Sequence, residues 1–423
     1  MSDRSRRALE AALERIRADH ELNAWSHLAI GEALEAAAES DMRLAAGTAR
    51  SPLEGRLIAL KGNIAVRGWP YEGGLASRRG ECAERDAALV SRLRAAGAVL
   101  LGQTRMDAGA LGAEGRSIDG PIRNPHRPSH SVGGSSGGCA AALAAGHVEL
   151  AVGTDTIGSV RIPASFCGVS SLKPSKDRID LDGVLPVHPQ FDHAGPMTTR
   201  ASMLWPMMNV LTGMTPSAEG VTPNGPHRGF EGRVIGYVAD ASSLGATIDV
   251  LEHFDRGLER LRALGATLVP LALAPLDPIR TRRAVFSLCE HTMWKQHRHG
   301  LETMPERYAP ALRAMLDYGG SLSDQKLAEF EQRVRQFAVA ARSMMQPVSV
   351  LVMPTTPRQA FDYAGDTPTD LADLTVFATA AELPAVSVPL ATGDALPVGL
   401  QIVTSAGQDE LACELASIFE RGP

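Results

Sequence analysis

The chain has 423 residues, of which 44% are apolar and 21% are charged. This composition is ordinary for a soluble globular protein with a sizeable core, and it excludes a disordered chain, a collagen and a coiled coil. Lys and Arg number 42 against 48 Asp and Glu, which gives a net charge of −6. The chain therefore lacks the surplus of basic residues that would indicate a nucleic acid partner.

The five cysteines are far apart and never form a Cys-x-x-Cys pair. Neither a disulfide framework nor a structural zinc site is expected, and a reducing compartment fits best. The N-terminal segment has paired arginines with no apolar stretch behind them, which is not typical of a secretory signal. The sequence contains no run of about 20 apolar residues, so no membrane span is predicted. We therefore expect a cytoplasmic protein with no membrane partner.

Helix and strand signals alternate along the chain after an N-terminal helix, whose buried face is expected to carry Leu9, Leu13 and Ile16. The predicted strands are residues 56–60, 98–101, 149–152, 234–238, 267–269 and 348–353. The predicted helices are one capped by Asp86 and ending at Gly97, one at 136–146, and one around Leu251, Phe254, Leu258 and Leu261. This alternation predicts a single large α/β domain, with a mixed, mostly parallel central sheet and helices on both faces.

Two later stretches carry no chemistry-bearing motif. Residues 212–232 are rich in Pro, Gly, Ser and Thr, which predicts a loop or an internal boundary. Residues 280–346 are mostly helical in pattern and are expected to form a cap or a wall of the substrate pocket. For Phe286, Trp294, Met304 and Tyr318 in these helices, packing on the core is favoured over contact with substrate. The same preference applies to Met106 and Asp107, which follow the strand at 98–101, with a place near the pocket floor as the alternative.

The segment Ser131-Val132-Gly133-Gly134-Ser135-Ser136-Gly137-Gly138-Cys139 is too rich in glycine and serine for a regular helix or strand. A phosphate cradle does not fit, because no Lys follows the glycines and no GxGxxG is present. A flexible linker is disfavoured, because an alanine-rich helix begins at once.

A second compact motif runs from Gly153 to Pro163 and presents Ser159 in a turn of small residues after an apolar strand. A serine nucleophile with backbone N–H groups aimed at the developing oxyanion needs such a turn. Lys61 leaves the strand at 56–60, and a buried lysine can lose its proton near neutral pH and act as a base. Histidine is the competing base, but neither His130 nor His193 lies in a lipase-type pattern.

Together these segments resemble the amidase signature family, the serine hydrolases that include fatty acid amide hydrolase, malonamidase and the A subunits of the tRNA-dependent amidotransferases. The matching residues are 59–63, 133–138 and 153–163, with further likeness at 124–125, 192–196 and 396–401. The resemblance implies the amidase signature fold over the whole chain, 1–423. Within it, we expect N-terminal helices at 1–50, the signature core at 53–200, a variable substrate-side helical region at 213–346, and the C-terminal part of the core at 347–423.

The resemblance also assigns roles. Lys61 corresponds to the family's catalytic lysine, Ser135 to its cis-serine and Ser159 to its nucleophile. The peptide bond at Ser135 would be cis. Backbone N–H groups of Thr156, Ile157, Gly158 and Ser159 would form the oxyanion hole.

Supporting positions follow from the same likeness. Ser136 would hydrogen-bond to the relay, and Asp155 and Arg161 would hold the loop. Arg161 has an equally weighted alternative, in which it binds a substrate carboxylate. The loop glycines Gly133 and Gly134 complete the predicted site.

The chain departs from the family pattern at several positions. Gly62 stands where an Asp is usual, and Ile157 where a Gly is usual, so the side chain of Ile157 is expected to point away from the oxyanion pocket. Cys139 replaces a common serine and is interpreted as a small buried packing residue. Thr379 and Glu382 stand where the family often has Asn and Gly.

We expect an amide hydrolase that acts on a small carboxamide through an acyl-enzyme and releases ammonia or an amine, with no metal and no cofactor. The low aromatic content, 4%, favours a small polar pocket over a large aromatic-lined channel. Two alternatives stay open: a component of an amidotransferase complex, similar to the A subunits named above, and a catalytically silent binding protein on the same fold. A homodimer and a complex with a small partner subunit stay open too.

Overall fold

Strands from almost the whole length of the chain join into one 11-stranded sheet in the computed structural model. The structure describes residues 3–214, 229–393 and 395–422. In chain order the strands are β1 (Trp25–Leu28), β2 (Leu57–Lys61), β3 (Val99–Thr104), β8 (Leu150–Asp155), β9 (Ser170–Lys173), β10 (His193–Thr198), β11 (Val234–Val238), β12 (Thr267–Leu271), β13 (Val350–Pro354), β14 (Ala385–Pro389) and β15 (Gly399–Thr404). Two small hairpins, β4 (Arg116–Ser117) with β5 (Gly120–Pro121) and β6 (Arg123–Asn124) with β7 (Arg127–Ser131), lie outside it.

The order of the strands across the sheet is β1-β3-β2-β8-β10-β9-β14-β15-β13-β11-β12. β2 runs parallel to β3 and β8, and β11 runs parallel to β12 and β13. The ladders between β8 and β13 in the centre are antiparallel. The mixed sheet is thus confirmed, but the expectation of mostly parallel strands is wrong. The alternation of strands and helices indicates which elements exist but not how they pair. The central pairings join strands far apart in sequence, so their direction could not be predicted from that alternation.

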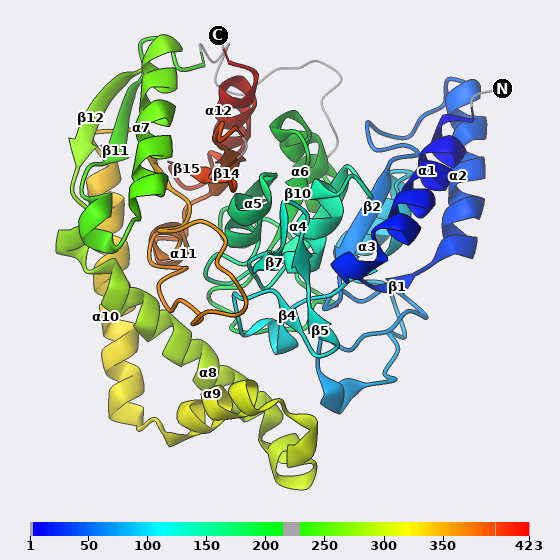
Figure 1. Cartoon of the computed structure of the whole chain (residues 1–423), viewed down its shortest axis with the longest axis horizontal. Helices are drawn as coiled ribbons and strands as arrows, with labels where there is room; N and C mark the ends of the chain where they lie inside the picture. The colour runs from blue at the N-terminus through cyan, green and yellow to red at the C-terminus, as the bar shows by residue number, and fades with distance from the viewer. Residues whose placement is uncertain (1–2, 215–228, 394, 423) are drawn as a thin grey trace.

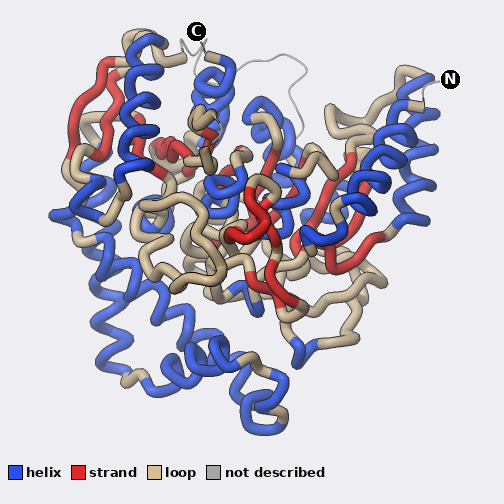
Figure 2. Tube along the Cα trace, in the orientation of Figure 1, coloured by secondary structure: helices blue, strands red, loops and turns tan. Residues whose placement is uncertain are grey.

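Helices cover both faces of the sheet, as predicted (Figures 1 and 2). They are α1 (Arg4–Ala18), α2 (Ile30–Ala45), α3 (Ala88–Ala95), α4 (Gly137–Ala144), α5 (Arg161–Cys167), α6 (Leu204–Thr212), α7 (Ile248–Ala263), α8 (Pro278–Thr303), α9 (Pro310–Ser321), α10 (Asp324–Met345), α11 (Val376–Ala380) and α12 (Asp409–Arg421).

Alternate side chains of β2 show how the sheet divides two cores. Ile58 and Leu60 belong to a cluster with residues of α3, α6, α7 and α12. Leu57 and Ala59 belong to a second cluster with residues of α1, α2, α4 and α5. Lys61, the last residue of the strand, has the same parity as Ala59, which places it at the end of the row that faces α4.

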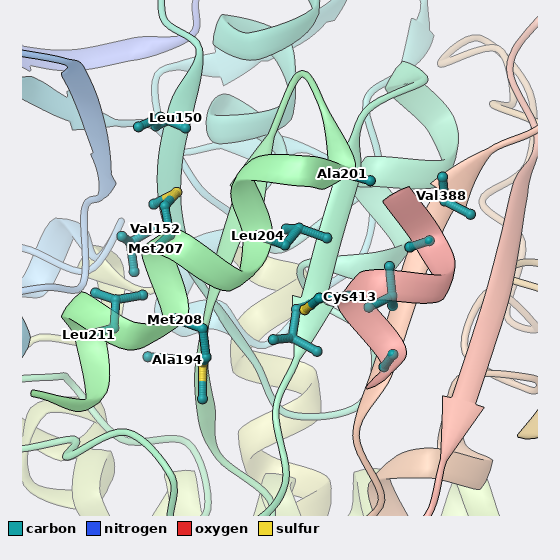
Figure 3. Close-up of a cluster of buried hydrophobic side chains, with 14 of the residues drawn as sticks. Leu150, Val152, Ala194, Ala201, Leu204, Met207, Met208, Leu211, Val388 and Cys413 are labelled. Carbon is teal, nitrogen blue, oxygen red and sulfur yellow. The ribbon is translucent and has the colours of Figure 1, made fainter. Parts of the chain in front are cut away.

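Part of the first core is shown in Figure 3, where side chains of α6 and α12 lie between their helices and the sheet. Met207, Met208 and Leu211 of α6 are buried with Val152 of β8 and Ala194 of β10. This apolar layer fixes the position of β8, whose carboxyl end continues into the turn at Ser159.

The predicted strands and helices are present, with shifted ends. The helix expected after Asp86 begins at Ala88, so the assignment of Asp86 as its cap is wrong. The Asp86 carboxylate instead accepts hydrogen bonds from the backbone N–H of Arg67 and from the Arg94 side chain. Gly97 follows the helix with φ +84°, which is the left-handed conformation that favours glycine after a helix end.

The helical character expected over residues 280–346 is confirmed by α8, α9 and α10, which group together in Figure 1. The loop expected at 212–232 falls largely on residues 215–228, which lie outside the described part of the chain. Within the described ranges, no helix has the length and apolar character needed to cross a membrane.

Candidate active site

Three segments far apart in sequence meet at one edge of the sheet. β2 and β8 are parallel neighbours, with Leu60 opposite Val152, so their carboxyl ends lie together. Lys61 ends β2, and the turn with Ser159 follows β8. The loop with Ser135 precedes α4, which packs on β2 and β8. The fold therefore brings all three predicted side chains into one region.

Lys61 lies fully buried against the glycine- and serine-rich loop. Its Nζ is 2.7 Å from Ser135 Oγ, 2.7 Å from Thr154 Oγ1 and 3.5 Å from the Thr154 carbonyl oxygen. Burial lowers the pKa of Lys61 to about 8, although nearby groups such as Asp107 and Asp155 act in the opposite direction. The amine can therefore lose its proton close to neutral pH.

Thr154 is a neighbour of Lys61 that the sequence did not single out. A neutral amine has two N–H groups and one lone pair. The Thr154 hydroxyl and carbonyl oxygens can accept from both N–H groups, which leaves the lone pair facing the Ser135 hydroxyl. The Asn63 side chain also donates to Thr154 Oγ1, at 3.2 Å. The available signal was the place of Thr154 inside the motif, next to Asp155.

We expect Thr154→Val, which removes the hydroxyl acceptor, to lower kcat by about 10- to 100-fold. Lys61 becomes an ammonium as it takes the proton of Ser135, and a hydrogen bond to a charged group contributes about 1.5–3 kcal/mol. Steady-state kinetics on any accepted amide would measure this. Thr404→Val on β15, whose hydroxyl donates to the Gln408 carbonyl, is the matched control and should retain kcat. A wild-type kcat in Thr154→Val would contradict the positioning role.

The loop that carries Ser135 is held by close packing of its backbone. The Gly134–Ser135 peptide bond is cis, as the resemblance implied. A Cβ at Gly134 would collide with the Asp107 carboxylate, so only glycine fits this position. Gly133 has φ +71°, and its N–H donates to Ser131 Oγ at 2.9 Å.

Ser159 differs from Lys61 and Ser135 in facing open space. Its residue is 9% exposed and lines a large cavity, whereas Lys61 and Ser135 are 0% exposed. Its carbonyl oxygen accepts from the Ser136 N–H at 3.1 Å, which ties its turn to the loop. Among the described residues, the Ser159 hydroxyl makes no hydrogen bond, to Ser135 or to any other group. Such bonds often close only when substrate is bound.

The turn before Ser159 leaves its backbone donors free. The N–H groups of Thr156, Ile157, Gly158 and Ser159 donate to no partner in the described part of the chain. The Thr375 hydroxyl donates to the Ile157 carbonyl oxygen, so the Gly158 N–H of the same trans peptide points the opposite way. The Thr156 hydroxyl donates to Asp192 at 2.7 Å, which fixes the start of the turn.

Gly158 and Ile157 show how the turn is built around one glycine. Gly158 has φ +147°, and a Cβ there would meet the Thr375 hydroxyl. Ile157, at the position where the family usually has glycine, belongs to the apolar cluster formed by α8 to α11. The departure at Ile157 therefore adds a residue to the lining of the cavity.

Asp155 and Arg161 form a fully buried ion pair beneath the turn, with Nη2 3.0 Å from Oδ1 and Nε 3.0 Å from Oδ2. Burial alone would raise the pKa of Asp155, but the Arg161 charge and hydrogen bonds, aided by Lys173 and His193, together lower it. The remaining Arg161 donors reach the Thr375 carbonyl, Gln401 and Thr379. With all its N–H groups occupied and no exposure, Arg161 is a structural residue, and its expected alternative contact with a substrate carboxylate is wrong.

We expect Arg161→Met to lower the free energy of unfolding by about 3–5 kcal/mol, because it leaves the Asp155 carboxylate buried without a counter-charge. Urea denaturation would measure the change. Arg335→Met, which breaks the exposed pair with Glu331, should cost less than about 1 kcal/mol. Equal losses in the two variants would refute the structural role.

Of three other residues weighed in the sequence, Ser136 departs from its expected contact, whereas Cys139 and His193 do not. The Ser136 hydroxyl does not reach the relay but donates to the Thr154 carbonyl at 3.1 Å. Cys139 is buried beside Thr104, and burial raises the pKa of its thiol to about 11, in keeping with a packing role. His193 is buried, with its ring nitrogens 2.7 Å from the Phe191 carbonyl and 3.4 Å from Lys173 Nζ, and contacts neither serine.

Asp107 is a buried acid of the site that the sequence assigned to packing. Its carboxylate accepts from the backbone N–H groups of Glu114, Gly115 and Arg116, and it lines the cavity beside Ser159. Burial raises the pKa of Asp107 to about 6. Its place directly after the strand at 98–101 had indicated the pocket floor as the alternative to packing.

The cavity has a volume of about 780 Å³. Its wall includes α8 and the start of α9, so part of the helical region lines the cavity beside Ser159. The expected small polar pocket is wrong, because the space is large and is lined mainly by Leu, Ile, Ala and Met, with Phe286 as its one aromatic residue in the described part of the chain. Phe286 lines it, whereas Met304 lines a second cavity of about 390 Å³ and Trp294 and Tyr318 line neither. Within the described residues, no group of His, Cys, Asp or Glu is arranged to hold a metal ion.

Comparisons with known proteins agree over nearly the whole chain. A family model described as Amidase matches residues 7–413. The A subunit of the glutamyl-tRNA(Gln) amidotransferase of Burkholderia pseudomallei (strain 668) is 31% identical, with 97% of this chain and 92% of that protein covered. A crystal structure described as an amidase is 31% identical with a TM-score of 0.89, covering 98% of this chain and 95% of that one. The peptide amidase of Stenotrophomonas maltophilia is 27% identical with a TM-score of 0.82, covering 99% and 93%.

Proposed function

The chain belongs to the amidase family of enzymes, which act on C–N bonds, and from this premise we propose that it hydrolyses a carboxamide through Ser159, Ser135 and Lys61. The observation that carries the proposal is the buried contact of 2.7 Å between Lys61 Nζ and Ser135 Oγ, beside a serine turn with unpaired N–H groups that opens into a cavity.

In the first half of the reaction, Ser159 Oγ attacks the amide carbonyl carbon. Its proton passes to Ser135 Oγ, and the proton of Ser135 passes to neutral Lys61 Nζ. The carbonyl oxygen becomes an oxyanion and accepts hydrogen bonds from the free N–H groups of residues 156–159. Preorganised donors of this kind lower a barrier strongly, since losing one costs about 10²–10³ in rate in other hydrolases.

In the second half, the C–N bond breaks and the departing nitrogen takes a proton from Ser135, which regains one from Lys61. Ammonia or an amine leaves, and the acyl group stays as an ester on Ser159 Oγ. Water then attacks the ester with the same relay as base, which releases the carboxylic acid and restores Ser159.

A screen for ammonia release over aliphatic amides, dicarboxylic monoamides, aryl amides and urea derivatives tests the proposal, with a fluorophosphonate probe to report a reactive serine. We expect turnover of at least one amide and labelling of Ser159. No turnover and no labelling would instead favour the catalytically silent binding protein.

The similarity to the A subunit of an amidotransferase supports a second candidate, in which the chain passes ammonia to a partner protein. Copurification of the natively expressed chain separates the two. Stoichiometric partner proteins, together with an amide donor hydrolysed only in their presence, would support the amidotransferase candidate, and full hydrolysis by the isolated chain would contradict it.

A further inference from the structure

The cavity beside Ser159 is lined by both exposed and buried residues. Ile279 and Arg280 at the start of α8, and Ala309 and Ala311 at the start of α9, line it and are exposed. Other lining residues are buried and mainly apolar: Leu111, Ile157, Ile162, Cys289, Leu312 and Leu371. A molecule that fills the cavity therefore contacts many apolar side chains beside Ser159.

Most charged groups of the lining have close partners, whereas the exposed Arg280 has only a 3.7 Å contact with Asp277. Arg282 Nε is 2.8 Å from Asp373, Arg283 is 3.5 Å from Glu290, and Arg116 is 3.3 Å from Glu114. The Asp107 carboxylate is held by backbone N–H groups. An anionic group on the substrate would thus compete with the existing partners of Arg116, Arg282 and Arg283, and a small polar substrate would leave most of the apolar wall in contact with water.

The reaction geometry decides which half of the amide lies in this space. The departing nitrogen must take a proton from Ser135, and Ser135 and Lys61 are fully buried and do not line the cavity. The carbonyl carbon is bonded to Ser159, which does line it. The substituent left to extend along the cavity is therefore the acyl group.

We propose that the substrate is the amide of an apolar acid, aliphatic or aryl, whose acyl part fills the cavity between α8, α9 and the Ser159 turn. This inference rests on the proposed function and specifies its substrate class. A volume of about 780 Å³ lies in the range of ~300–1,000 Å³ in which proteins bury a drug-sized ligand, well beyond what acetamide needs.

The test is kcat/KM for primary amides from acetamide to octanamide, with the monoamide of adipic acid beside hexanamide. We expect kcat/KM to rise about fourfold for each added methylene, the ratio that about 0.8 kcal/mol for each buried CH₂ produces. The adipic monoamide should be the poorer member of its pair. A flat or falling series, or a preferred monoamide, would overturn the inference while leaving hydrolysis in place. If no amide is hydrolysed and the fluorophosphonate does not label Ser159, the proposed function falls and the inference falls with it.

A pair of phenylalanine variants locates the effect. Phe286→Ala on α8 removes a lining side chain, and we expect the octanamide-to-acetamide ratio of kcat/KM to fall roughly tenfold, the low end for one apolar pocket contact. Phe330→Ala on α10 is the matched control, because Phe330 packs on the same core cluster but does not line the cavity. The control should keep the wild-type ratio. Equal ratios in both variants would overturn the assignment of this cavity to the acyl group.

Discussion

Ser159→Ala is expected to lower kcat by roughly 10⁶-fold, the loss seen when a serine hydrolase loses its nucleophile. Without Oγ no ester can form. Because Ser159 no longer attacks the carbonyl carbon, no tetrahedral oxyanion arises for the N–H groups of residues 156–159 to stabilise. Amide hydrolysis, followed as ammonia release on an accepted substrate, measures the loss. Residual turnover within tenfold of wild type would remove Ser159 from the mechanism.

The fold should be unaffected, because the Ser159 hydroxyl makes no hydrogen bond in the described part of the chain. Ser171→Ala on β9 is the matched control. Ser171 is buried, and its hydroxyl has no hydrogen-bond partner among the described residues, but it lies outside the site. It should retain both thermal stability and kcat, so a loss confined to Ser159→Ala cannot be a general effect of removing a buried hydroxyl.

Lys61→Met is expected to remove nearly all activity and, with it, the pH dependence. Lys61 acts as a base only when neutral, and burial lowers its pKa to about 8. In the wild type, kcat/KM should therefore rise about tenfold for each pH unit up to about pH 8 and then level off. Lys61→Met cannot accept the proton of Ser135, so its residual kcat/KM should show no such rise.

In the described part of the chain, three other buried groups titrate near this range and have to be separated from Lys61, among them Glu290, whose pKa burial raises to about 7. Burial raises the pKa of Asp107 to about 6 and lowers that of Lys173 to about 7. Lys173 is buried and contacts the Pro174 carbonyl and His193. Lys173→Met should keep the rise of kcat/KM up to about pH 8. Loss of this rise of kcat/KM with pH in Lys173→Met, or its presence in Lys61→Met, would contradict the assignment of Lys61 as the base.

Local patterns predicted the parts of the site that depend on one segment. The apolar run before Lys61 is a strand, the alanine-rich stretch after the serine loop is a helix, and the turn after β8 presents Ser159. Each depends on residue spacing over a few positions. The helical wall at 280–346 was also predictable, because its periodicity is sustained over three helices.

Features created by contacts across long sequence separations were not predictable. The occupancy of every Arg161 donor needs Thr375, Thr379 and Gln401, which lie more than 200 residues away. The antiparallel centre of the sheet likewise depends on β9 pairing with β14. The apolar character of the cavity arises because α8 and α9 fold back over the Ser159 turn, and aromatic content says nothing about which aliphatic side chains meet there.

The relay from Lys61 through Ser135 to Ser159 is tested most directly by the rate at which a fluorophosphonate labels the protein as a function of pH, with the labelled residue located by mass spectrometry. We predict a single label on Ser159, with a rate that climbs to a plateau near pH 8 in the wild type and shows no climb in Lys61→Met. A label on another residue, or the same pH-independent rate in both proteins, would contradict the relay.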